Sequence, residues 1–303
     1  MLRFLIERLL YIAAVSVIIV FFVFLGMNMA KNSEIPDPNY DLITQGKTAW
    51  YSTQVYLTGV LAGDFGTFIE DGNEILVKDR LKDSYLNSMG LLLVSLFIAA
   101  LIGLSFGGLI ALIKYRFVVL PLLTLTILGV SIPSFFGGLM MRHGILTYRR
   151  LVGPIGLNIT GMDWDLSHML LPVIVLSARP IAYLTRSAFV SLSQVMQEDY
   201  IRTAFSKGLR YSWIIFVHAL RNIAVPVLTA VGVSLRFSLS SLPVIEYLFI
   251  WKGIGYHLFT AINDRQVLIV ATLALALGLT FQLVNLFLDL IYRIIDPRVR
   301  EIS

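Results

Sequence analysis

Long apolar runs are the feature of this sequence that most limits its possible folds. A helix needs about 20 predominantly apolar residues to cross a bilayer. Five runs meet this requirement, and a sixth is weakened by two arginines, Arg179 and Arg186; the six runs are residues 9–30, 89–113, 117–140, 169–192, 223–245 and 267–291. They lack the two-residue alternation of transmembrane barrel strands. The sequence therefore predicts an all-α membrane protein with six transmembrane helices.

The overall composition agrees with this class and excludes a soluble one. Hydrophobic residues make up 57% of the 303 residues and charged residues only 14%, against about 25% charged in soluble domains. The absence of cysteine excludes disulfides and thiolate metal sites. The first apolar run follows Arg3 and Arg8, as in a signal sequence, but it is longer than a signal core and no A-x-A site follows. We interpret it as a retained first span.

Basic residues indicate the orientation of the spans. With six spans the two termini lie on one side, and the short connections on that side are rich in lysine and arginine. These residues are Arg3, Arg8, Lys114, Arg116, Arg202, Lys207, Arg210, Arg221, Arg293, Arg298 and Arg300. Basic connections are typical of the cytoplasmic face. We therefore expect a multi-pass protein with both termini in the cytoplasm, and the net charge of +5 reflects orientation and not nucleic-acid binding.

The segment between the first two spans has a different character. Residues 31–85 are rich in acidic residues, prolines and glycines, which predicts a small irregular extracellular cap. The expected organisation is a cytoplasmic tip and first span over residues 1–30, the cap over 31–85, and a transmembrane core over 86–303. The core contains a cytoplasmic loop at residues 193–222.

Two patterns within the spans predict local structure. Gly103 and Gly107 form a GxxxG face, which favours close contact with another helix. Pro133, which follows Ser131 closely, predicts a kink or an interruption of the third span. Such a break either lines a cavity or is a plain packing kink, and the sequence leaves both interpretations open.

The most informative segment of the cytoplasmic loop is EDYIRTAFSKG, residues 198–208. Ile201, Ala204, Phe205 and Leu209 recur at helical spacing on one face, and Gly208 is well placed as a left-handed C-terminal cap. A helix this short needs to pack against something to be stable. Another protein is one such surface, and anionic lipid is the alternative. A DNA-binding role is disfavoured because membrane spans hold both ends.

Here the sequence resembles a known family. The run DYIRTAFSKGL, followed by HALRN and Pro226, is similar to the coupling loop of ATP-binding-cassette (ABC) importer permeases, above all the first permease of oligopeptide and dipeptide (peptide/nickel) importers. Other landmarks agree in order along nearly the whole chain: LRFLIERLL at residues 2–10, GDFG at 63–66, GVSIPSF at 129–135, IEYLFIWKGIG at 245–255 and DPRVR at 296–300. Arg202 and Thr203 replace an archetypal Glu and Ala of the loop.

The resemblance implies a type I importer permease in a bacterial or archaeal cell membrane. It implies a heterodimer with a second permease, two cytoplasmic ATPases and an external solute-binding protein. This chain then binds no cofactor, since the ATPases use ATP and Mg. The implied ATPase-coupling residues are Glu198, Asp199, Tyr200, Ile201, Arg202, Thr203, Ala204, Phe205, Lys207, Gly208 and Leu209. Peptides are the implied substrate, with nickel or other metal chelates or another small solute as the alternative.

Two arginines depart from what the family resemblance suggests. Arg179 and Arg236 fall near the middles of the fourth and fifth spans, where a charge is costly and faces a bundle interior or an aqueous cavity. We expect them to line the pathway, together with Ser131 and Pro133, and to favour substrates with a negative group. An internal ion pair or a carbonyl-bound arginine is the alternative.

Polar residues of the last span carry a separate prediction. Gln282, Asn285 and Asp289 share one face, which favours interhelical hydrogen bonds, and we expect Asp289 to pair with an arginine that the sequence does not identify.

Catalysis and a stand-alone transporter find little support in the sequence. The four histidines are scattered and form no H-x-x-x-H pair, so no metal site is indicated. Gly46-Lys47-Thr48 imitates the end of a phosphate-binding loop, but Asp41 stands where that loop begins with glycine. A secondary transporter needs intramembrane acids and usually a repeated half, whereas Asp289 alone lies deep in a span. The predicted chain is a non-catalytic subunit.

Overall fold

The computed structural model describes residues 2–34, 41–70, 72–113, 115–154 and 156–295. The chain forms two compact units, which are described here one at a time. Unit 1 contains residues 1–88 and 250–290, and unit 2 contains residues 89–249 and 291–303. The predicted landmark at residues 296–300 lies outside the described residues.

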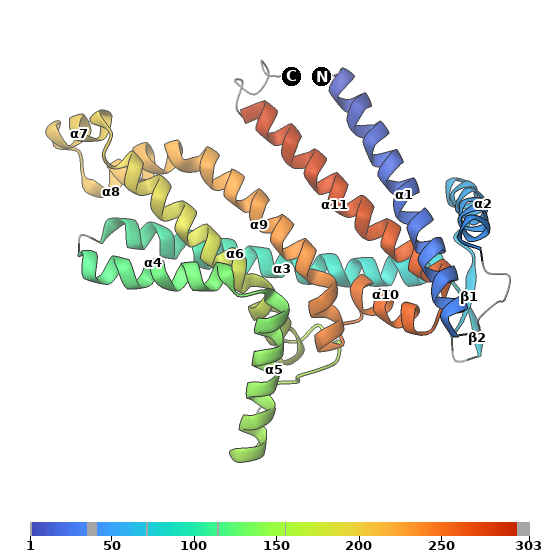
Figure 1. The fold of residues 1–303 in the computed structure, drawn as a ribbon. Coiled ribbons are helices and arrows are strands. Elements are labelled where there is room, and N and C mark those ends of the chain that lie inside the picture. Colours follow the sequence, from blue (N-terminus) through green and yellow to red (C-terminus); the bar gives the residue numbers. More distant parts are fainter. Residues whose placement is uncertain (1, 35–40, 71, 114, 155, 296–303) are drawn as a thin grey trace. The chain divides into compact units, whose positions relative to one another are not determined.

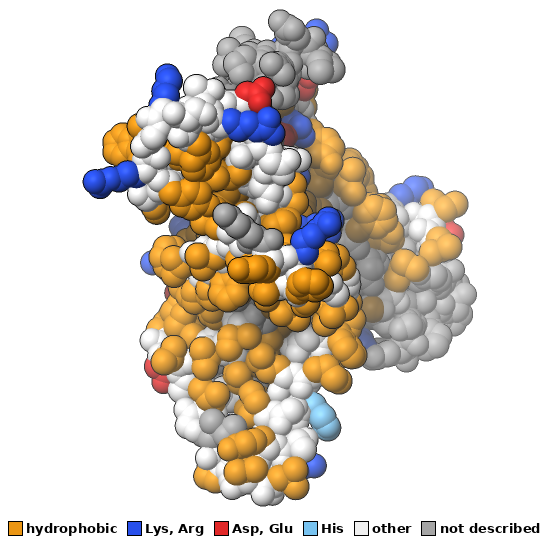
Figure 2. All heavy atoms as spheres, turned by 90° about the vertical axis from the view of Figure 1, so that its left-hand side faces the viewer, with side chains coloured by type: hydrophobic (Ala, Val, Ile, Leu, Met, Phe, Trp, Pro, Cys, Tyr) orange, Lys and Arg blue, Asp and Glu red, His pale blue; other side chains and the backbone are white. Residues whose placement is uncertain are grey.

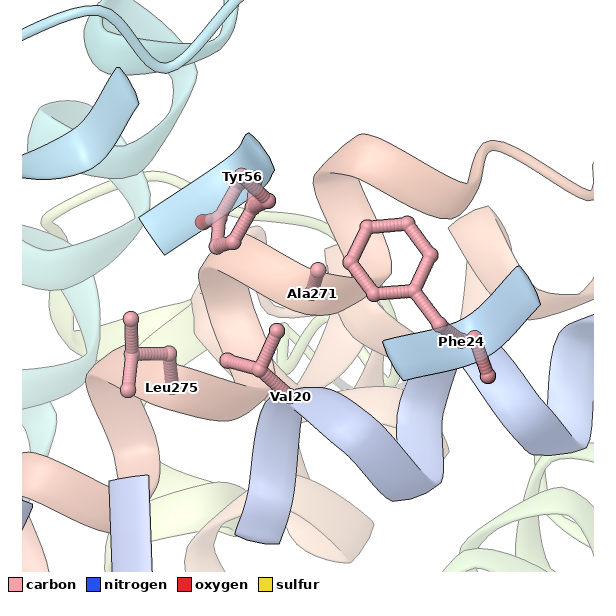
Figure 3. Close-up of a cluster of buried hydrophobic side chains, with 6 residues drawn as sticks. Val20, Phe24, Tyr56, Ala271 and Leu275 are labelled. Carbon is pink, nitrogen blue, oxygen red and sulfur yellow. The ribbon is translucent and has the colours of Figure 1, made fainter. Parts of the chain in front are cut away.

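Unit 1 is built around α1 (Leu2–Glu34), α2 (Leu42–Leu61), α10 (Ile254–Asn263) and α11 (Val267–Ile295). One cluster of buried side chains joins three of these helices through Val20, Phe24, Tyr56, Ala271 and Leu275 (Figure 3). The Tyr56 hydroxyl lies 2.8 Å from the Thr272 hydroxyl, so the one polar atom brought into this cluster has a hydrogen-bond partner. The contact joins the segment after the first span to the last span.

The segment after the first span is more regular than the sequence predicted. In place of an irregular cap it contains the 20-residue helix α2 and a hairpin of β1 (Thr67–Glu70) and β2 (Asn73–Leu76). The Asp41 carboxylate caps α2 by accepting from the amides of Ile43 and Thr44. Gly63, Gly66 and Gly72 have positive φ angles and form the turns that follow, so they do not interrupt the helix. Two prolines of this segment, Pro36 and Pro38, lie outside the described residues.

Unit 2 is centred on α6 (Leu166–Val195), which packs mainly against α9 (Leu220–Phe249) and α4 (Arg116–Ser131) (Figure 1). It also contains most of α3 (Val77–Leu112). The predicted GxxxG contact is confirmed. A Cβ added at Gly103 would lie 2.8 Å from Leu184 Cβ, and one added at Gly107 would collide with the carbonyl oxygen of Thr185. These two glycines let α3 approach α6 more closely than any side chain would permit.

The third apolar run is broken, as Pro133 predicted, but it is not the straight span expected over residues 117–140. Helix α4 ends at Ser131, and α5 (Ser134–Leu151) leaves it at an angle of 99° (Figure 1). Ile132, the residue before the proline, has an extended ψ of 120°, the conformation that a following proline favours. Arg149 and Arg150 lie in the last turn of this second helix.

The helices have the length and composition of membrane spans. Among the described residues, five helices are long and apolar enough to cross a bilayer, or up to six if the bent α4–α5 pair counts as one. Figure 2 shows hydrophobic side chains over much of the face turned to the viewer. Exposed residues such as Phe117 and Leu151 belong to these helices. The predicted all-α membrane architecture is thus confirmed, with five to six candidate spans among the described residues.

Candidate functional site

The predicted coupling segment, residues 198–208, contains a short helix in the structure, α7 (Asp199–Ser206), of eight residues. Glu198 is extended and precedes the first turn, which contains Asp199 and so places a carboxylate near the positive end of the helix dipole. The chain leaves the helix through Gly208, whose φ of +74° confirms the predicted left-handed termination.

One face of α7 packs against its own chain. Ile201 is fully buried and Ala204 nearly so, and both join a cluster with residues from the end of α6, from the segment η1 (Ile214–Ala219) and from the start of α9; these residues are Leu192, Ile214, Ala219 and Ile223. The prediction that packing must stabilise this short helix therefore holds, with the same chain as the packing partner. Phe205 and Leu209, which the helical spacing placed on the same face, are exposed in the structure. Leu209 leaves the helical path because the chain turns at Gly208.

The outward face of α7 combines charged and aromatic groups. All predicted coupling residues other than Ile201 and Ala204 are exposed. Phe205 stacks on Tyr211 with ring centroids 5.9 Å apart, and the Asn222 amide donates to the Tyr200 hydroxyl at 2.9 Å. These contacts attach the outward face to the segment that begins α9. Sequence reasoning missed Tyr211 and Asn222, although an aromatic residue shortly after the segment 198–208 was a signal for the first of them.

The helix that follows α7 carries a π-helical segment. Residues Tyr211–Trp213 form α8, Ile214–Ala219 form the π segment η1, and α9 continues directly from it. π-helical turns are rare in proteins, and a large share of them lie at functional sites. Ile214 and Ala219, at the two ends of η1, are both in the cluster that holds α7. The residues that pack under α7 therefore include the two ends of the π-helical segment that precedes α9.

A second candidate site lies at the bend between α4 and α5. A cavity of 180 Å³ opens there, lined by α4, α5 and α6, and its residues include Gly129, Pro133, Gly137 and Arg179. The structure thus brings Arg179 and Pro133 together. Ser131 and Arg236, two other predicted pathway residues, are not among the residues that line it. The Ser131 hydroxyl is exposed and donates to the Ile127 carbonyl of its own helix at 2.8 Å.

The two mid-span arginines of unit 2 have no charge partner among the described residues. The Nε atoms of Arg179 and Arg236 are buried without a hydrogen-bond partner, and within the described ranges neither side chain forms an ion pair. The Arg179 guanidinium carbon lies 4.2 Å from the centre of the Phe237 ring, which is a cation–π contact. The internal ion pair that was one alternative for these arginines is thus not found in this part of the chain. Their predicted place along a pathway stays a prediction.

The acidic residue of the last span, unlike these two arginines, has a charge partner. Asp289 pairs with Arg8 of α1 at 2.5 Å, which identifies the arginine that the sequence left open. The hydrogen bonds predicted for Gln282 are wrong for this structure, because its buried amide nitrogen and oxygen have no partner among the described residues. Helical spacing placed Gln282 and Asp289 on one face, but it does not determine which polar groups the neighbouring helix presents there.

Comparison with known proteins connects these features to a family. The model of a family described as "Binding-protein-dependent transport system inner membrane component" matches residues 99–301. The probable peptide ABC transporter permease protein y4tP of Sinorhizobium fredii is 32% identical over 250 residues, which are 81% of this chain and 78% of that protein. The glutathione transport system permease protein GsiC of Salmonella typhi is 30% identical over 81% of this chain and 78% of its own length. The protein of the same name from Escherichia coli (strain K12) is 28% identical over 99% of both chains.

Proposed function

Because the chain belongs to the family of binding-protein-dependent transport system inner membrane components, as a permease subunit of an ABC importer, we propose that it forms one half of a translocation pathway for peptides. The match to the family model covers the region from α3 to the end of α11, which contains both candidate sites. This membership replaces the stand-alone secondary transporter as an interpretation. The printed names of the relatives, which refer to peptide and glutathione transport, support a peptide substrate.

The permease works with ATPase subunits and a solute-binding protein, as its family implies. In our proposal a different, second permease completes the pathway, two ATPases bind on the cytoplasmic side, and ATP and Mg are used by those subunits alone. The exposed charged residues of α7 and the basic residues Arg210 and Arg221 support a cytoplasmic position for this face. Both termini then lie in the cytoplasm of a bacterial or archaeal cell.

We assign the contact with an ATPase to α7, and one observation carries this assignment. The helix is anchored by Ile201 and Ala204 to a cluster from α6, η1 and α9, while its other side is exposed and bears Tyr200, Arg202 and Phe205. A helix that was only a linker needs no such anchoring. Because the buried face packs on both helices, a force applied to the exposed face moves α6 and α9 together.

The proposed mechanism is alternating access. Closure of the ATPases on ATP displaces α7, α6 and α9 follow because they are packed to it, and the pathway beside them opens first to one side of the membrane and then to the other. Arg179, Arg236, Ser131 and Pro133 are assigned to that pathway. The bend between α4 and α5 supports this part of the proposal, because irregular backbone at membrane depth is tolerated where it lines a cavity or is buried in protein.

Substitution of Gly208 tests the coupling assignment. A Cβ at Gly208 has open space around it, but the φ of +74° disfavours every side chain, so Gly208→Trp should displace the end of α7 through the backbone. We expect peptide uptake by the reconstituted transporter to fall at least about tenfold, a loss of about 1.4 kcal/mol in coupling. ATP hydrolysis should no longer be stimulated by the loaded binding protein.

The matched control is Gly63→Trp. Gly63 also has a positive φ, of 83°, and open space around it, but it lies in the external segment after α2. We expect this variant to assemble and to keep its coupling between ATP hydrolysis and uptake. Normal uptake by the Gly208→Trp transporter, purified with all its subunits, would reject α7 as the coupling helix.

Glutathione is the second candidate substrate, favoured by the names of several relatives. Uptake of glutathione and of a linear peptide by the same proteoliposomes, each supplied through the binding protein, distinguishes the two. The metal chelates that the family resemblance left open have no comparable observation in their favour.

A further inference from the structure

The cavity at the α4–α5 bend has an unusual lining for a space among membrane helices. Most of its lining is apolar, from residues such as Ile132, Val175 and Met141, and Arg179 is the one charged residue among those that line it. Its volume of 180 Å³ is several times the share of one water molecule in the liquid, about 30 Å³. It is smaller than the roughly 300–1,000 Å³ of pockets that enclose a drug-sized ligand. The cavity therefore has room for at least one end of a solute.

The position of Arg179 suggests what that end should be. The side chain is partly buried, its Nε atom has no hydrogen-bond partner, and no acidic residue of the described ranges pairs with it. Phe237 lies against the guanidinium at 4.2 Å, and Tyr183 meets Phe237 edge to face with ring centroids 5.6 Å apart. A ring over the face of a guanidinium does not block its edge, which carries the N–H groups. The planar guanidinium edge matches the two oxygens of a carboxylate.

We propose that Arg179, in the cavity at the α4–α5 bend, binds a carboxylate of the substrate during its passage and so makes carboxylate-bearing peptides the preferred cargo. This inference rests on the proposed peptide importer. It also separates the two arginines that the sequence treated alike, because Arg236 does not line this cavity. Arg179 is then a specificity-determining residue, and Arg236 is not part of this subsite.

The test uses the complete transporter in proteoliposomes with its binding protein. The substrates are one peptide with a free C-terminal carboxylate and the same peptide with a C-terminal amide, chosen so that the binding protein binds both equally. We expect the wild-type transporter to take up the acid about tenfold faster than the amide. In Arg179→Gln the ratio should approach one through slower uptake of the acid, and Arg179→Lys should keep part of the preference because it retains the charge but not the planar fork.

A second variant fills the cavity and leaves Arg179 in place. Gly137 lines the cavity, and a Cβ added there meets its nearest side-chain neighbour, Ile132, only at 4.0 Å. Gly137→Leu should therefore fit without moving the backbone, occupy the space, and reduce the acid-to-amide ratio. Gly144→Leu, on the same helix with open space around it, is the matched control and should keep the wild-type ratio. Arg186→Gln is the control for the charge, since Arg186 is exposed on the same helix as Arg179.

The outcomes separate this inference from the proposed function. If the wild-type transporter takes up neither peptide, the proposed function fails. If it takes up acid and amide equally, or if Arg179→Gln assembles and keeps the acid preference, the carboxylate subsite is wrong. Binding of a lipid phosphate by Arg179 instead predicts that Arg179→Gln changes uptake of both peptides by the same factor, which also rejects the subsite. If Arg179→Gln does not assemble, an unchanged ratio in Gly137→Leu rejects it.

Discussion

The two units handle charges within their apolar helices in opposite ways. In unit 1, Asp289 of α11 pairs with Arg8 of α1, and the side chains keep 25% and 41% of their exposure, respectively. In unit 2, Arg179 and Arg236 lie near the middles of α6 and α9 without a carboxylate partner in the described ranges. In the first arrangement the chain supplies both partners of the ion pair. In the second, the Nε atoms of the two arginines lack a hydrogen-bond acceptor in the described ranges.

The magnitudes show why this difference matters. An arginine at the centre of a membrane helix costs about 2.5–3.5 kcal/mol on insertion scales. A cation–π contact such as that of Arg179 with Phe237 returns about 0.5–2 kcal/mol. The cation–π contact therefore offsets only part of the cost of inserting Arg179. Its contribution to stability alone does not explain why an arginine stands there. A paired charge indicates a structural role, and an unpaired charge beside a cavity indicates a ligand.

Unit 1 also contains a third arrangement, a half-buried group that stays neutral. Burial, followed by the nearby positive charges of Arg80 and Lys252, lowers the pKa of His257 in α10 to about 4. Arg80 is itself paired with Glu70 of the hairpin. The imidazole is therefore uncharged at neutral pH, and this region needs no acid to balance it.

Reversing the charge of Asp289 is expected to have the largest effect on the free energy of unfolding. Asp289→Lys removes the partner of Arg8 and puts a second positive charge beside it. Because both groups keep some exposure, we expect a loss of about 2 kcal/mol, below the 3–5 kcal/mol of a fully buried pair. Thermal unfolding in detergent measures it. The double variant Arg8→Asp with Asp289→Lys should recover most of the loss, and a double variant no better than Asp289→Lys alone would argue against the pair.

Removing the charge of Arg179 should change stability in the other direction. Arg179→Met eliminates the cost of the mid-span charge and the smaller gain from Phe237, so we expect a gain of about 1 kcal/mol. The measurement is the unfolding midpoint of the assembled transporter without substrate. Arg186→Met, at the exposed position on the same helix, should leave the midpoint nearly unchanged. A clear loss of stability in Arg179→Met would instead place Arg179 among the structural charges and end the contrast between the units.

Acidification should give the smallest effect, through His257. Its folded-state pKa of about 4 lies below the ordinary value of 6.5, so the unfolded state takes up the proton first. The stability contribution is complete above pH 6.5 and is lost as the pH falls from there towards 4. We expect a loss of about half a kcal/mol between pH 7 and pH 6. Unfolding as a function of pH should show this slope in the wild type and not in His257→Gln, and an equal slope in both would contradict a neutral, half-buried His257.

Much of the architecture follows from local sequence patterns. Runs of about 20 apolar residues determine the spans because no other secondary structure satisfies the backbone in lipid over that length. Pro133 determines a break because it lacks an N–H and restricts the residue before it. Gly208 determines the end of α7 because few residues other than glycine adopt its backbone conformation readily. Each of these effects acts within a few residues of its cause.

Other features depended on the packing of helices that are distant in the chain. The sequence placed Arg179, Arg236 and Asp289 inside spans, but only the fold gave Asp289 its partner Arg8 and placed Arg179, not Arg236, on the cavity beside Pro133. It also buried Ile201 and left Phe205 exposed, although both share the helical period. Periodicity specifies which face of a helix is apolar. The crossing of that helix with its neighbours decides which residues of the face are covered and which charges meet.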